Sequence, residues 1–222
     1  MNYLLKMAQR IDTLNELMIK GWRNKDLDFR RALRIEAAEA MESTPWKWWK
    51  SGEMDRSNLI VEGVDMMHFG LSICLLDGYE GWNWLDEEVS RLMESKMQVP
   101  DDSIVETVQN TIDNIMEMTF DKSISLTGPS DLIYEITKLM WFLGVSRDEM
   151  FKLYFAKNIL NEFRQLNGYK SGEYIKDWDG SEDNVFMQNS IDDIAISSHF
   201  EDDLYKLLED KYEAVKASKK EE

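Results

Sequence analysis

Cysteine, histidine and proline are scarce in this chain of 222 residues, which contains one cysteine, two histidines and three prolines. A single cysteine, Cys74, excludes a disulfide framework and a thiolate metal cage, and it fits a reducing compartment such as the cytoplasm. The two histidines are His68 and His199, and only His68, with Asp65, forms an acidic-x-x-His element, whereas a di-iron bundle needs such an element on each of two helices. Zinc and di-iron sites are therefore both disfavoured.

Positive charge is also scarce, because 26 Lys and Arg residues face 43 Asp and Glu residues and the formal net charge is −17. Such a chain repels nucleic acid polymers and anionic membrane surfaces. Long apolar runs are lacking as well. The stretch 1–22 mixes charged with apolar residues, unlike a signal peptide, and the most apolar stretch, 59–76, is interrupted by Glu62 and Asp65. Neither a signal peptide nor a membrane span is expected.

The apolar residues recur at helical spacing, and no alternating pattern flanked by hairpin turns is present. The sequence therefore predicts an all-α multi-helix bundle, and its even composition predicts a single domain over 1–222. SRDE at 146–149 predicts a capping box formed by Ser146 and Glu149. The stretch 168–200 is expected to be largely loop, and 218–222 a frayed tail. The expected helices are 2–20, 28–43, 55–77, 83–96, 102–119, 130–143, 147–166 and 201–217.

Two pairs of carboxylates stand three residues apart, at Glu36 and Glu39 and again at Glu62 and Asp65. Positions three apart share a helix face, and the second pair lies on a helix that is otherwise apolar, so it should face the interior. Two carboxylates about 6 Å apart repel by roughly 3 kcal/mol at an effective dielectric of about 20. The arrangement therefore calls for cations, and oxygen ligands without cysteine favour Mg²⁺.

Plainer interpretations exist for some of these residues. Glu36 and Glu39 could lie on a solvated helix face beside Arg34 or Lys47, as charged pairs on helices usually do. His68, three residues after the second pair, could be a core histidine, a partner of the metal ligands or a contact to substrate.

Cations concentrate between 157 and 176, against the negative balance of the whole chain. Lys157, Asn161 and Arg164 follow one helical face, and Lys170 and Lys176 follow on a glycine-rich segment. Side-chain and backbone donors of this kind bind anions, so the basic strip and the carboxylates together indicate a polyphosphate site. The alternative is that the lysines serve surface solubility, although the forked guanidinium of Arg164 suits phosphate oxygens.

These motifs resemble those of the dimeric dUTPases, a family of all-α nucleoside triphosphate pyrophosphatases. The acidic motif reads E-x-x-E at 36–39 and E-x-x-D at 62–65, a pattern that also fits MazG-like and phosphoribosyl-ATP pyrophosphohydrolases. The segment KNILNEFRQLNGYKSGEYIKDWDGSEDN at 157–184 is similar to the longer C-terminal signature, and TPWKWWK and EGVDMMHF are similar to neighbouring segments. The resemblance spans about 12–184.

The resemblance implies a homodimer that hydrolyses dUTP to dUMP and pyrophosphate with Mg²⁺, and that accepts dUDP as a second substrate. It implies that Mg²⁺ is held by Glu36, Glu39, Glu62 and Asp65, with Glu39 helping to activate the attacking water. It implies phosphate contacts from Lys157, Arg164, Tyr169, Lys170 and Lys176. It implies a nucleoside pocket formed with Asn15, Trp46, His68, Asn161, Gly168 and Asn184.

One position departs from the family pattern, because Asp12 stands where relatives have Gln, three residues before Asn15. The selection of uracil over cytosine is therefore open, and a related pyrimidine nucleotide pyrophosphatase that accepts dCTP is an alternative. A second alternative is a non-enzymatic helical protein whose carboxylates bind a structural divalent cation and whose partner is another protein.

Overall fold

The computed structural model describes residues 2–96, 103–120, 128–191, 194, 197 and 199–219, and this part of the chain is almost entirely helical. The all-α prediction is confirmed. A short 3-10 helix, Trp22–Asn24, and a two-stranded hairpin, β1 (Asp177–Trp178) and β2 (Ser181–Glu182), complete the elements. The α-helices are α1 (Tyr3–Met18), α2 (Phe29–Glu42), α3 (Arg56–Leu76), α4 (Trp82–Glu94), α5 (Ile104–Phe120), α6 (Pro129–Phe142), α7 (Arg147–Leu166), α8 (Asp183–Ile191) and α9 (Phe200–Ser218).

Side-chain caps mark where several helices begin. The carboxylates of Asp28 and Asp55 accept hydrogen bonds from backbone N–H groups in the first turns of α2 and α3. The predicted capping box is present at α7, where Ser146 Oγ accepts from Glu149 N at 3.2 Å and Glu149 Oε2 accepts from Ser146 N at 3.3 Å. These bonds satisfy N–H groups that the helix itself leaves unpaired, so they fix the starts of the helices that carry the site.

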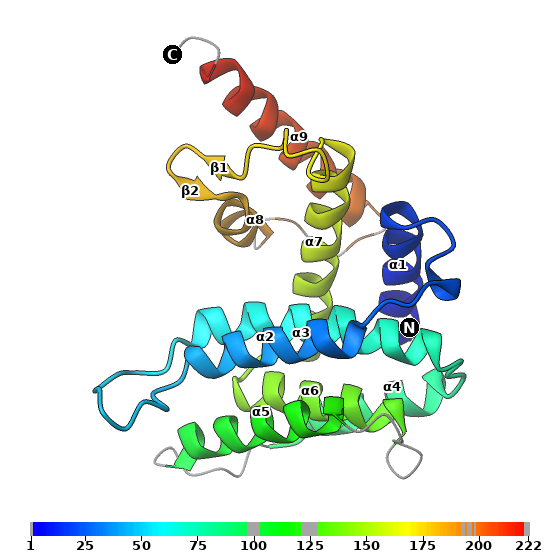
Figure 1. The fold of residues 1–222 in the computed structure, drawn as a ribbon, viewed down its shortest axis with the longest axis vertical. Helices are drawn as coiled ribbons and strands as arrows, with labels where there is room; N and C mark the ends of the chain where they lie inside the picture. The colour runs from blue at the N-terminus through cyan, green and yellow to red at the C-terminus, as the bar shows by residue number, and fades with distance from the viewer. Residues whose placement is uncertain are drawn as a thin grey trace.

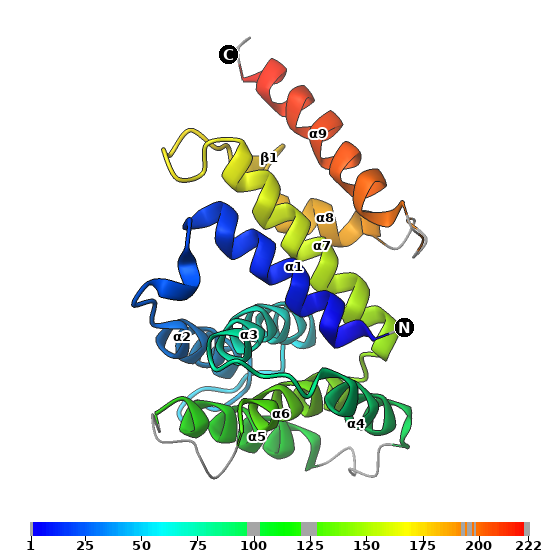
Figure 2. The ribbon, with the colours of Figure 1, turned by 90° about the vertical axis from the view of Figure 1, so that its right-hand side faces the viewer.

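The helices form layers around α3. Helices α2 and α3 lie side by side, and α4, α5 and α6 lie beneath them (Figure 1). Helices α1 and α7 lie on the opposite side of α2 and α3. Turned by 90°, the molecule shows α1 running along α7, while α8, α9 and the hairpin gather around the far half of α7 (Figure 2). The carboxyl-terminal third of the described chain is therefore built on α7.

Helix α3 is the core helix. It packs against α1, α2, α6 and α7, and it is long and apolar enough to cross a membrane by composition alone, but 72% of its most apolar window is buried inside the protein. Two glycines permit this packing on the α6 side. A Cβ atom at Gly63 would lie 2.4 Å from Met140 Sδ, and one at Gly70 would lie 3.0 Å from Ile133 Cδ1. The apolar character of α3 is thus explained by its burial.

The stretch 168–200, expected to be largely loop, contains the hairpin and helix α8. The hairpin turns at Asp179 and Gly180, which both have positive φ, as Asp-Gly turns between two strands usually do. In α8 only Asp183, Met187 and Ile191 are buried. Because the buried face is so narrow and one of its residues is charged, the sequence of this segment shows little helical periodicity of apolar residues. Of the expected frayed tail, Ser218 ends α9, and 220–222 lie outside the described residues.

Candidate active site

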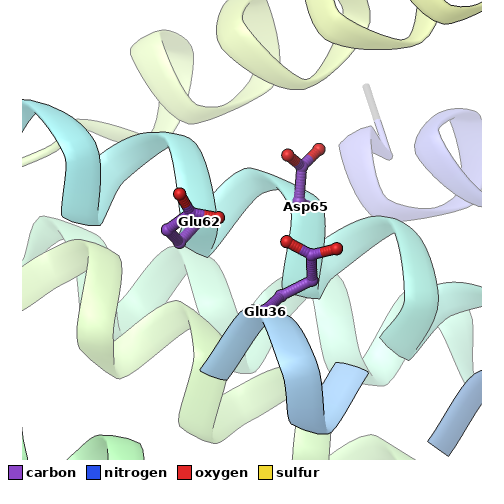
Figure 3. A group of neighbouring side chains, drawn as sticks. All are labelled: Glu36, Glu62 and Asp65. Atoms are coloured by element: carbon purple, nitrogen blue, oxygen red, sulfur yellow. The ribbon is translucent and has the colours of Figure 1, made fainter. Parts of the chain in front are cut away.

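Three carboxylates from two adjacent helices meet between α2 and α3. Glu36 extends from α2 toward Glu62 and Asp65 on α3 (Figure 3), and one oxygen of each lies within 4.8 Å of the others. Glu62 is 8% exposed, and the other two side chains are partly buried. Such a group of hard oxygen ligands has the composition of a divalent-cation site.

The electrostatics of this cluster show uncompensated negative charge. Burial, the charge of Asp65 and a hydrogen bond to Glu62 raise the pKa of Glu36 to about 8. Burial is also the largest cause of the raised pKa of Glu62, followed by the charge of Asp65. In the metal-free protein Glu36 therefore keeps a proton at neutral pH. A divalent cation would neutralise the carboxylates in its place, so the residues present fit such an ion.

Glu39 differs from its predicted partner Glu36. It lies on the exposed side of α2 and is not a member of the three-carboxylate cluster, although its charge contributes to the raised pKa of Glu36 and Glu62. Among the described residues, neither Arg34 nor Lys47 pairs with either glutamate: Arg34 lies over the Phe120 ring and Lys47 pairs with Glu42. The solvated-face interpretation thus suits Glu39 and does not suit Glu36.

A buried lysine adjoins the cluster. Lys157 Nζ on α7 donates to Asp65 Oδ2 at 2.8 Å, and the lysine side chain is 8% exposed. Lys157 also lines a narrow crevice between α3, α7 and α8 that Asn184 lines from the α8 side. The structure therefore brings Lys157, which was predicted to contact substrate, beside three of the four predicted metal ligands, and it places Asn184 in the same crevice as Lys157.

His68 is fixed within the core. Its ring stacks on Tyr154 with centroids 4.1 Å apart, and its Nδ1 lies 2.8 Å from the carbonyl oxygen of Val64. Burial lowers the pKa of His68 to about 4, so the imidazole is neutral. Its Nε2 is buried and has no hydrogen-bond partner among the described residues. One face of this side chain therefore serves packing, and one nitrogen is left for a ligand or a water molecule.

A cavity of about 280 Å³ lies one helical turn away from the carboxylates. Its wall includes Ala32, four residues before Glu36 on α2, and Phe69, four residues after Asp65 on α3. Asn15 from α1 also lines it, together with Met18, Ile19, Trp22, Asp26, Leu27, Asp28 and Phe29. Because residues four apart share a helix face, the cavity and the carboxylate cluster open along the same groove between α2 and α3.

Asp12, the residue that departs from the family pattern, forms an ion pair with Arg23. Its Oδ1 accepts from Trp22 Nε1 at 2.9 Å, and its Oδ2 accepts from Arg23 Nη2 at 2.9 Å. Arg23 also donates to the carbonyl oxygen of Leu75 at the end of α3. The carboxylate of Asp12 therefore positions the indole of Trp22, which lines the cavity. The sequence did not indicate this role.

A family model described as dUTPase matches residues 3–169, most of the chain. The chain belongs to the dUTPase family. No curated protein matches it significantly. As a dUTPase, the protein is a hydrolase of nucleotide metabolism with dUTP diphosphatase activity, and dUTPases generally use a divalent metal. The match contains all four predicted metal ligands and ends before Lys170, Lys176 and Asn184.

Arg164 of this dUTPase lies where the basic strip predicted it, but its donors are engaged within the protein. Arg164 Nε and Nη2 donate to the two carboxylate oxygens of Asp183 at 2.8 and 2.7 Å, and further bonds go to Asn161 Oδ1 and Asn184 Oδ1. Asp183 is fully buried and also accepts from Tyr174 Oη at 2.7 Å. Asp183 was not predicted as a site residue, and its only signal in the sequence is its position in the acidic stretch SEDN, 181–184.

The remaining predicted phosphate contacts lie on the exposed surface after α7. Tyr169, Lys170 and Lys176 are exposed, and Lys176 pairs with Glu182 at 3.0 Å. Gly168 has φ +87°, a left-handed conformation that allows the chain to turn out of the helix. The loop 168–176 thus follows directly from the helix that carries Lys157.

Trp46 lies apart from these groups, in the loop between α2 and α3. It is 39% exposed, packs edge-on against Trp49 and has Lys47 over its ring. Among the described pockets, none that adjoins the carboxylates has Trp46 in its wall. Its role in the nucleoside pocket stays a prediction.

Proposed function

We propose that this dUTPase hydrolyses dUTP to dUMP and pyrophosphate in a Mg²⁺-dependent reaction, and that dUDP is a second substrate. The observation that carries the proposal is the cluster of Glu36, Glu62 and Asp65, which places oxygen ligands beside Lys157 and one helical turn from a cavity that can take a nucleoside.

The carboxylates Glu36, Glu62 and Asp65 would hold Mg²⁺, and Glu39 would join them from the exposed side of α2. The metal, when bound, supplies neutralisation of phosphate charge and activation of water. Lys157 stands beside Asp65 and gives the phosphates a cation on the α7 side of the cluster. Lys170 and Lys176 extend the positive charge along the loop that follows α7.

The cavity beside the cluster suits the base and the deoxyribose. Phe69 and Ala32 offer apolar surface on the same helix faces as Asp65 and Glu36. A nucleotide with its base in this cavity therefore directs its phosphates toward the carboxylates. The same binding mode serves dUDP, because it does not depend on the γ-phosphate.

The amide of Asn15 favours uracil over cytosine. Ser72 Oγ donates its only hydrogen to the carbonyl oxygen of His68 at 2.8 Å, so it can only accept from Asn15 Nδ2, at 2.9 Å. This orients the amide and leaves Asn15 Oδ1 as a free acceptor among the described residues. That oxygen can accept N3–H of uracil, whereas cytosine presents a lone pair at N3 and leaves the acceptor unpaired.

We also propose that the protein is a homodimer and that it acts in the cytoplasm. The loop between α2 and α3 exposes Trp48 to 90% and Trp49 to 59%, an apolar surface of the kind that subunit interfaces cover. Cys74 is a buried free thiol, which suits a reducing compartment. The acidic balance of the chain argues against partnership with nucleic acid polymers or membranes.

The testing experiment measures pyrophosphate release from dUTP, dCTP, dTTP and UTP, with Mg²⁺ and with EDTA. Selective dUTP cleavage that needs Mg²⁺ and is lost in both Glu62→Gln and Glu39→Gln supports the proposal. Equal cleavage of dCTP would contradict the role of Asn15, and undiminished activity in EDTA would contradict the metal site. Glu87→Gln, which replaces an exposed glutamate on α4 outside the cluster, is the matched control and should retain activity.

A further inference from the structure

Helix α9 lies beyond the residues that the family model matches, yet it contacts the segment that carries two of the predicted phosphate ligands. It packs on α7, beside the loop and hairpin that follow α7 (Figure 2). Its inward face includes Tyr212, which is 3% exposed. A helix appended at this place can act on the loop without entering the site itself.

Tyr212 makes the contacts that join α9 to the loop. Its hydroxyl oxygen accepts a hydrogen bond from Ile175 N at 3.1 Å. Its ring stacks on Tyr174 with centroids 5.0 Å apart and planes 22° apart, and it also packs against Trp178 at 5.7 Å. The neighbouring Lys211 donates to Asp179 Oδ2 in the hairpin turn at 2.5 Å.

The anchored residues stand between the two loop lysines. Tyr174 and Ile175 separate Lys170 from Lys176, and both lysines are exposed. Elsewhere the loop is held by its own backbone, with Glu173 N donating to Gly168 O at 3.0 Å. The second half of the loop is also held by the bond from Tyr174 Oη to Asp183 and by Asp183 N, which donates to Lys176 O at 3.0 Å, so Tyr212 is the anchor that α9 contributes.

We propose that Tyr212 is a positioning residue, through which α9 fixes the loop 168–176 so that Lys170 and Lys176 are held ready for the phosphates. The inference rests on the proposed function of that loop. Tyr212 itself bonds to the loop backbone and contacts no substrate. A loop that is ordered before binding loses less conformational entropy when the phosphates arrive, so the anchor strengthens binding of the phosphate chain.

The test compares Tyr212→Phe with Tyr205→Phe. The two variants make the same chemical change on the same helix, but Tyr205 packs on Phe163 and its hydroxyl makes no hydrogen bond within the described residues. Binding of pyrophosphate with Mg²⁺ is measured by calorimetry, KM and kcat for dUTP by pyrophosphate release, and the exchange rate of the Ile175 amide hydrogen by NMR.

Loss of one hydrogen bond predicts that Tyr212→Phe weakens pyrophosphate binding about fivefold and raises KM by a similar factor, with kcat within about twofold of the wild type. The Ile175 amide should exchange faster, and Tyr205→Phe should change none of these quantities. Faster Ile175 exchange with unchanged pyrophosphate binding would overturn the proposal, as would a wild-type protein that does not bind pyrophosphate. Failure of the proposed function is a separate result, because it would appear as absent dUTP turnover in the wild type.

Discussion

Lys157 Nζ lies 2.8 Å from Asp65 Oδ2, so a buried cation already neutralises one member of the carboxylate cluster. The pair joins α7 to α3, the two helices that also meet where the His68 ring stacks on Tyr154. Glu36 and Glu62 form no ion pair within the described residues, and burial is the largest cause of the raised pKa of each. A divalent cation at the proposed site would compensate these two carboxylates, with which Lys157 does not pair.

Replacing Lys157 by methionine should reduce the free energy of unfolding by about 3 kcal/mol, because it leaves Asp65 as a buried charge without its partner. Urea denaturation of the metal-free protein measures the loss. Lys170→Met is the control, since Lys170 is exposed and its replacement should cost well under 1 kcal/mol. Equal stability of the two variants would show that the Lys157–Asp65 pair does not contribute to the free energy of unfolding.

The metal-free protein should lose stability as the pH rises. The pKa of Glu36 is 4.5 in the unfolded reference and about 8 in the folded protein, so the folded state binds the extra proton between these values. The contribution is complete below about pH 4.5 and disappears as the pH passes through about 8. His68, with its pKa lowered from 6.5 to about 4, acts in the opposite direction only below about pH 6.5.

Melting temperatures in EDTA at pH 7.5 to 8.5 isolate the carboxylate effect, because His68 is then largely neutral in both the folded and the unfolded state. The melting temperature should fall across it, and Glu36→Gln should flatten the profile. Added Mg²⁺ should stabilise the wild type more at pH 8 than at pH 6.5, since fewer Glu36 protons then have to be displaced. A wild-type profile in EDTA that rises with pH would contradict the assignment.

Asp183→Asn should cost about 3 kcal/mol of stability, because it removes the buried countercharge of Arg164. The substitution should also abolish activity, since Arg164, Tyr174 and the start of α8 all depend on this carboxylate. Thermal denaturation and dUTP turnover are the measurements. Glu182→Gln, which removes the exposed partner of Lys176, should change stability by less than about 1 kcal/mol.

Ser72→Ala should lower discrimination between dUTP and dCTP by about tenfold in kcat/KM, because it frees the Asn15 amide to present either its oxygen or its nitrogen to the base. The comparison of kcat/KM for the two nucleotides measures the effect. Ser90→Ala is a matched control, since Ser90 Oγ also donates to a carbonyl four residues earlier but lies away from the cavity. An unchanged ratio in Ser72→Ala would remove Ser72 from the recognition of the base.

The sequence predicted α1 to α7, α9 and the buried stripe of α3, because all of these depend on local periodicity, but it did not predict α8. Glu62 and Asp65 stand out on an apolar helix, and Ser146 and Glu149 form a capping box through bonds that span only three residues. Such signals come from residues that are close in the sequence, and the folded structure contains both the buried helix and the capping box. The same reasoning supported Glu36 less well, since nothing in its own helix shows that it faces α3.

Arg164 shows what sequence spacing does not determine. Its place on the α7 face was predicted correctly, but its partner Asp183 lies 19 residues later and meets it only after the hairpin reverses the chain. An arginine beside a phosphate site and an arginine beside a buried carboxylate have the same local sequence. The same limit applies to Asp12, whose partners Trp22 and Arg23 belong to the linker after α1.

The carboxylates Glu62 and Asp65 stand on α3, where a methyl group added at Gly63 or Gly70 would force side chains of α6, Met140 or Ile133, to move. The lysines of the loop 168–176 stand on the surface, where side chains can change without disturbing the packing. Larger residues at these two glycines should therefore disturb the helix that carries the acidic pair, whereas replacements of the loop lysines should leave the fold intact. The positive charge of the loop can thus be redesigned separately from the packing around the carboxylates.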